Sequence, residues 1–161
     1  MANMRGVAAS LLLLLGCTAM QAPEPVEFHR LQRVDSIRFE INSWGRPMEA
    51  FVIRSDGSGE YRHAPSFGAD QEVHAFNAGP MGFGRIRAAL AGIERYISRA
   101  PACGQRMTDF PYGEIAWLDG IYPTTLRFDV GCQGAEMQRV VEAAHQAARL
   151  AEQFSRPGAG H

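Results

Sequence analysis

Hydrophobic and polar residues alternate along residues 36–43. Ile37, Phe39 and Ile41 occupy every second position, and the residues between them are charged or carry an amide. A period of two is typical of a strand with one buried face. The sequence therefore predicts a half-buried strand over residues 36–43.

Two further strand patterns follow, over residues 49–54 and 60–63. The sequence Asp56-Gly57-Ser58-Gly59 lies between them and supplies residues that tolerate a positive φ. This combination predicts a hairpin. The segment after it is rich in glycine and proline, although residues 72–76 could add another short strand.

Two helices are predicted by apolar residues that recur every three or four positions. The first begins at Phe83 and is ended by Pro101. The second spans residues 135–154 and has an alanine-rich inner face. Between the helices, residues 113–118 and 124–130 show a second pair of strand patterns, joined by a turn that begins at Asp119-Gly120.

The predicted order is βββαββα, which indicates the α+β class. We expect an antiparallel sheet of about five strands with both helices packed on one face, because that arrangement buries both apolar helix faces. The predicted domain spans residues 36–155. Residues 156–161 would form a disordered tail.

The chain begins with a different pattern. Residues 1–5 carry one arginine, residues 6–15 are apolar and include five consecutive leucines, and Gly16-Cys17 follows directly. This is the layout of a signal peptide, and its apolar stretch is well short of the roughly 20 residues that a membrane-spanning helix needs. We expect residues 1–16 to be removed.

The residues Leu14-Leu15-Gly16-Cys17 resemble the lipobox of bacterial lipoproteins. The resemblance implies cleavage before Cys17 and acylation of that cysteine, so the bilayer would be the first partner. Two or three acyl chains make a durable anchor. Thr18 stands where this class tends to have the aspartate that retains lipoproteins in the inner membrane, which favours the outer membrane, facing the periplasm. Residues 17–35, with two prolines, would form the lipidated N-terminus and a tether.

Export also determines the expected state of the other cysteines. Cys103 and Cys132 remain after Cys17 is acylated, and an oxidising compartment favours their pairing as a disulfide. The alternative is a nucleophilic Cys103 with His63, His74 or His145 as its base. No family-specific sequence surrounds Cys103 to favour that alternative.

Other chemistry has little support in the sequence. The five histidines show no H-x-H or H-E-x-x-H spacing and there is no C-x-x-C, so we predict no metal site from motifs, although one assembled only by the fold remains open. No nucleotide or other cofactor motif is present. Four carboxylates near the second hairpin could supply an acid and base pair: Asp109, Glu114, Asp119 and Asp129.

The most aromatic segment spans residues 107–117. Phe110, Tyr112 and Trp117 lie there, next to the predicted disulfide, and aromatic side chains on a rigid loop are suited to recognition. We predict a recognition surface from these three residues. The competing interpretation is that Phe110 and Trp117 complete the hydrophobic core.

All 16 basic residues are arginines, scattered among 17 acidic ones, which argues against a nucleic-acid partner.

Three functions remain open. We favour a non-catalytic envelope lipoprotein that binds another envelope protein. The strand and helix order is also loosely similar to small periplasmic protease inhibitors of the emfourin type. The third alternative is a hydrolase whose Asp and His residues are brought together by the fold.

Overall fold

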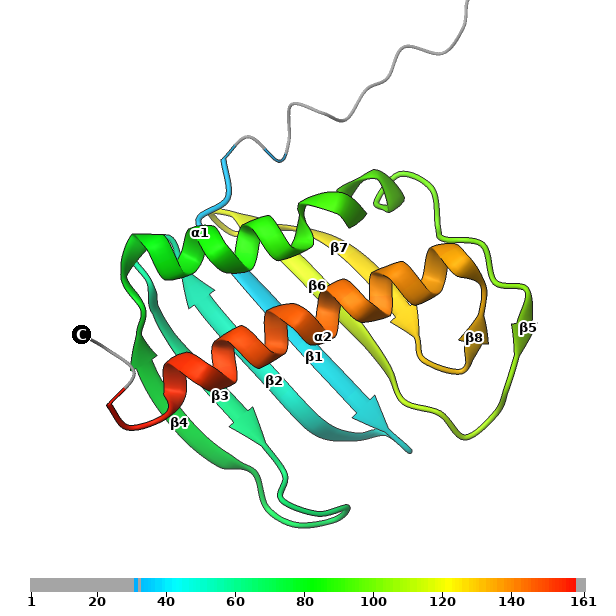
Figure 1. Cartoon of the computed structure of the whole chain (residues 1–161), viewed down its shortest axis with the longest axis horizontal. Helices are drawn as coiled ribbons and strands as arrows, with labels where there is room; N and C mark the ends of the chain where they lie inside the picture. Colours follow the sequence, from blue (N-terminus) through cyan, green and yellow to red (C-terminus); the bar gives the residue numbers. More distant parts are fainter. Residues whose placement is uncertain (1–30, 32, 159–161) are drawn as a thin grey trace, which may run out of the picture.

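The computed structural model describes residue 31 and residues 33–158. The lipobox, Cys17 and most of the predicted tether lie outside these residues. Within them, the fold is α+β, as predicted: an antiparallel sheet with helices on one face (Figure 1). None of the described helices combines the length and apolar character that crossing a membrane requires.

The strands outnumber the prediction because the optional strand before the first helix forms and two short strands are added. They are β1 (Ser36–Ser43), β2 (Arg46–Arg54), β3 (Ser58–His63), β4 (Glu72–Asn77), β5 (Gln105–Arg106), β6 (Tyr112–Asp119), β7 (Tyr122–Asp129) and β8 (Cys132–Gln133). The helices are α1 (Gly79–Leu90), the 3-10 helix η2 (Ala91–Tyr96) and α2 (Ala135–Ser155).

The first strand lies in the middle of the main sheet. Six strands are ordered β4-β3-β2-β1-β6-β7, and every neighbouring pair is antiparallel. Hairpins connect β1 to β2, β2 to β3 and β6 to β7, whereas β6 reaches β1 from a distant part of the sequence. The sheet therefore joins the two halves of the domain through β1.

The core lies between the sheet and the helices. Ile37, Phe39 and Ile41 of β1 point to the helix side, as the alternation predicts, and Ile37 is fully buried. Figure 1 shows α1 and α2 crossing this same face. The inner face of α2 consists mainly of alanines, which let the helix pack closely on the sheet: Ala144, Ala147, Ala148 and Ala151 are all buried.

The first helix begins earlier than predicted and ends differently. The glycine-rich residues before Phe83 form the first turn of α1, with Pro80 near its N-terminus, where a proline costs no hydrogen bond. Gly82 is buried, and the ring of Phe154 from α2 lies within 3.5 Å of where a Gly82 Cβ would stand. The predicted continuous helix becomes 3-10 after Leu90.

The packed domain also begins before residue 36. Val34 is buried in the core. Asp35 donates its N–H to Leu118 O at 2.8 Å, and its side chain accepts the N–H of Gly120 at 2.8 Å. The last residues assigned to the tether therefore belong to the domain.

Candidate functional site

The predicted disulfide is present. Cys103 and Cys132 are bonded, with their Cα atoms 5.4 Å apart. Cys103 precedes β5, and Cys132 is the first residue of β8, which pairs with β5 in a two-stranded sheet. Met107 N–H donates to Gly131 O at 2.8 Å. Cys103 is thus not available as a nucleophile, and the bridge fixes the segment that leads to β6.

The predicted recognition residues do not all lie on the surface. Phe110 and Tyr112 are exposed, at 44% and 47%. Trp117 is only 1% exposed, so its assignment to a recognition surface is wrong. It lies on the helix side of β6 because it follows Ile115 by two positions, and residues two apart on a strand share a face.

The face of the sheet opposite the helices is not covered by any described element. On β2 and β6 it carries small or apolar side chains: Ala50, Val52, Ala116 and Leu118. Arg38 and Glu40 of the central strand β1 lie between them, further charged side chains lie around them, and together they line a hollow of about 860 Å³. Tyr112 stands at its margin, so the exposed aromatic residue of β6 is continuous with this surface.

The charges of this uncovered face are only partly matched. Arg62 pairs with Glu60, and Arg127 binds Glu114 at 3.1 Å. Arg38 is different. It lies between Val52 of β2 and Ala116 of β6, and among the described residues it has no carboxylate partner.

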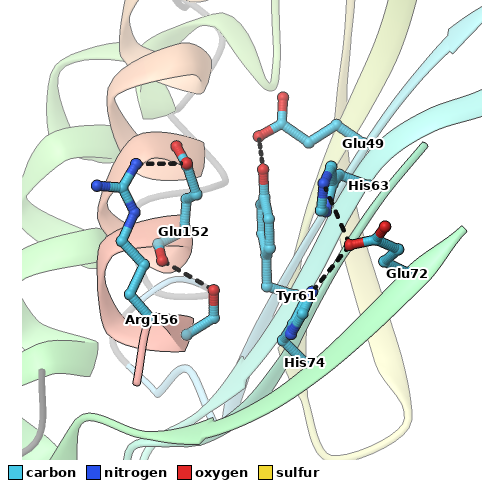
Figure 2. A network of polar contacts seen from close by, with 8 residues as sticks. Glu49, Tyr61, His63, Glu72, His74, Glu152 and Arg156 are labelled. Carbon is cyan, nitrogen blue, oxygen red and sulfur yellow. Dashed lines mark hydrogen bonds and ion pairs between the residues drawn. The ribbon is translucent and has the colours of Figure 1, made fainter. Parts of the chain in front are cut away.

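A second group of polar side chains lies on the helix side of the sheet, at the end of β3 and β4 (Figure 2). The strand register places His63 opposite Glu72 and Tyr61 opposite His74. Glu72 Oε2 is 3.8 Å from His63 Nε2 and 3.6 Å from His74 Nε2. We call His63, Glu72 and His74 the β3–β4 cluster.

Tyr61 connects this cluster to the core. Its hydroxyl donates to Glu49 Oε1 at 2.9 Å, and its ring is buried. Burial, followed by the negative charge of Glu49, raises the pKa of Tyr61 well above its ordinary value. The phenol therefore stays protonated and remains a donor. Glu152, on the nearby turn of α2, binds Arg156 at 2.7 Å.

The sequence did not predict the β3–β4 cluster. The pattern Glu72-Val73-His74 places two ligand-type side chains on one face of a strand, which is the one local signal. His63 lies nine residues before Glu72, across a loop, and no spacing rule gives the register that joins them. His145 stays apart from the cluster, on α2, although it lines the same recess as His63.

Two of the four carboxylates proposed for acid and base catalysis, Glu114 and Asp129, have structural partners. Asp129 binds Arg106 at 3.2 Å and accepts the N–H of Gly131 at 2.9 Å. Glu114 is held by Arg127. Glu114 and Asp129 therefore each face an arginine, and neither forms a carboxylate pair with the other.

Comparison with known proteins assigns this chain to no family. No protein-family model and no curated protein matches this chain.

Proposed function

We propose that this protein is a lipid-anchored, non-catalytic binding module of the bacterial cell envelope. Cys17 carries the lipid, the outer membrane holds it, and the domain faces the periplasm. The lipobox-like sequence Leu14-Leu15-Gly16-Cys17 supports the anchor. The disulfide Cys103–Cys132 supports an exported protein, because such bonds persist in oxidising compartments.

The binding partner we propose is another envelope protein, seated on the uncovered face of the sheet. The observation that carries this proposal is the hollow of about 860 Å³, in which apolar side chains of β2 and β6 flank the charged side chains Arg38 and Glu40 of β1. Protein interfaces combine apolar and polar side chains in this way. A solvated sheet face needs no such apolar side chains, because antiparallel sheets commonly expose polar side chains there.

The charge of this face specifies the partner further. Arg38 projects from the central strand between two small side chains and is exposed. A guanidinium without a carboxylate partner is a ready site for a bidentate contact with an acidic side chain. We therefore propose that the partner presents an aspartate or glutamate to Arg38.

The anchor is tested by the intact mass of the protein extracted from membranes. We expect a chain that starts at Cys17 and carries the added mass of its acyl groups. A Cys17→Ala variant should carry no lipid mass and should keep its leader uncleaved at this position. A wild-type chain that starts at Cys17 without lipid mass would contradict the anchor.

The interface is tested by photo-crosslinking in the native envelope. A crosslinking residue at Thr125, on the exposed face of β7, should capture one specific protein, and the same residue at Arg139, on the exposed side of α2, should not. Arg38→Glu should weaken the Thr125 crosslink, whereas Arg139→Glu should leave it unchanged. Equal capture from both positions would refute the assigned face. A captured protease would favour the inhibitor alternative.

A further inference from the structure

We propose that the β3–β4 cluster of His63, Glu72 and His74 binds a divalent transition metal ion, with zinc as the best fit. The three ligand atoms all lie within 4.8 Å of one another. Two imidazole nitrogens and one carboxylate oxygen are a frequent ligand set for zinc at a site that keeps an open position. This inference is independent of the proposed anchor and partner.

The spacing of the ligand atoms fits an ion better than it fits direct contacts. At 3.6 and 3.8 Å, the distances from Glu72 Oε2 to the two Nε2 atoms exceed those of hydrogen bonds. Atoms bound to one zinc ion at about 2.1 Å in a tetrahedral arrangement stand roughly 3.4 Å apart. A rotation of Glu72, whose side chain is 56% exposed, would bring its two distances to the histidine nitrogens toward that value.

The imidazole rings are oriented by packing. The ring of His63 stacks on Tyr61 with centroids 5.7 Å apart and on His74 at 5.8 Å. Tyr61 is itself fixed by its hydrogen bond to Glu49. Because the rings are already aligned, little side-chain freedom remains to be lost when an ion binds.

His63 depends on stacking for its orientation. Its Nδ1 atom is buried and has no hydrogen-bond partner among the described residues. A metal-bound imidazole is usually oriented by a hydrogen bond from its second ring nitrogen, and the described residues supply none to His63. The ring is therefore held by its stacking neighbours with Nε2 directed toward Glu72, as Figure 2 shows.

The site would leave part of the ion accessible. The side chains of His63 and His74 are 35% and 43% exposed, so water or a donor atom from another molecule can fill the remaining coordination positions. The chemistry of the ligands favours zinc, copper or nickel over magnesium or calcium, which prefer oxygen ligands. We expect the cluster to hold the metal ion at the β4 edge of the sheet.

Isothermal titration of the purified mature protein with zinc chloride tests the site. The protein should carry no histidine tag, since a tag would bind zinc itself. We expect one zinc ion per chain at the cluster, and at least about tenfold weaker binding in Glu72→Gln and His74→Gln, because loss of even an outer contact of a metal site commonly weakens binding by that factor. His145→Gln is the matched control. It removes a histidine from the same recess but outside the cluster, and should bind zinc as tightly as the wild type.

A spectroscopic measurement locates the ion. The imidazole ring signals of His63 and His74 should shift on addition of zinc, whereas those of His145 should not. Glu72 is exposed, so Glu72→Gln is expected to fold, and far-UV circular dichroism checks this. Absence of zinc binding by the wild-type protein, or binding that Glu72→Gln and His74→Gln leave unchanged, would overturn the proposal.

Discussion

Breaking the Cys103–Cys132 disulfide is expected to lower the free energy of unfolding by about 3.6 kcal/mol. The two cysteines are separated by 29 positions. The entropy that such a bridge removes from the unfolded chain is about 12 cal/mol/K by the loop-closure relation, which gives about 3.6 kcal/mol at room temperature. For a domain of this size, that change corresponds to a loss of roughly 10 to 20 °C in Tm.

The effect should arise mainly in the unfolded state. The pairing of β5 with β8 and the bond from Met107 N–H to Gly131 O do not depend on the bridge, so the folded segment should persist after reduction. Reduction and the double change Cys103→Ala with Cys132→Ala should therefore destabilise the protein by similar amounts.

Urea unfolding with and without a reducing agent measures this difference. Trp117 is 1% exposed and Trp44 is 70% exposed, so the change in tryptophan emission on unfolding reports chiefly on Trp117. The double alanine variant is the control and should not respond to the reducing agent. A difference between oxidised and reduced wild type below about 1 kcal/mol would refute the argument from the unfolded chain.

Three other changes test the packing and the electrostatics. Trp117→Ala should cost about 3 to 5 kcal/mol in urea unfolding followed by circular dichroism, because a buried aromatic side chain leaves a cavity; a cost below 1 kcal/mol would contradict its place in the core. The Ala102 N–H and then Arg99 lower the pKa of Glu136, so its stabilising effect is present above the ordinary value of 4.5 and is lost as the pH falls through the lowered pKa. Glu136→Gln should therefore be less stable than the wild type at pH 7, and the difference should disappear in acid; a difference that persists there would have another cause. Gly57→Ala should destabilise more than Gly120→Ala, because both glycines have a positive φ but a Cβ at Gly57 would stand 2.2 Å from the backbone of Gly79; equal losses in thermal unfolding would contradict the clash.

The strands with one buried face could be predicted from the sequence because burial imposes the period of two. In β1 the inward residues Ile37, Phe39 and Ile41 are all buried. The strand β4 gives a weak pattern because it lies at the edge of the sheet, where only Phe76 is buried. The start of α1 was missed because glycines are poor helix formers, and at Gly82, where a Cβ would stand 2.2 Å from the Cβ of Ala78, close packing outweighs that preference.

The sites depend on contacts that local patterns do not contain. Trp117 and Tyr112 belong to the same strand but point to opposite faces of the sheet, and the alternation along β6 is hidden because Ala116 and Leu118 are buried as well. The β3–β4 cluster requires the pairing of His63 with Glu72, which is determined by the length and path of the loop between them. The Cys103–Cys132 pair was easier to predict. Export to an oxidising compartment favours disulfides, and with Cys17 assigned to the lipid only these two cysteines remained to pair.

The central position of β1 also determines how the domain would respond to mechanical force. Asp35 leads directly into β1, which is bonded to β2 on one side and to β6 on the other. Tension transmitted through the residues ahead of Asp35 would act along the strand axis, at right angles to both sets of interstrand hydrogen bonds. These bonds would have to yield together in shear, whereas an edge strand such as β4 can be peeled away one bond at a time. A domain pulled from this end should therefore resist extension better than one attached through β4 or β7.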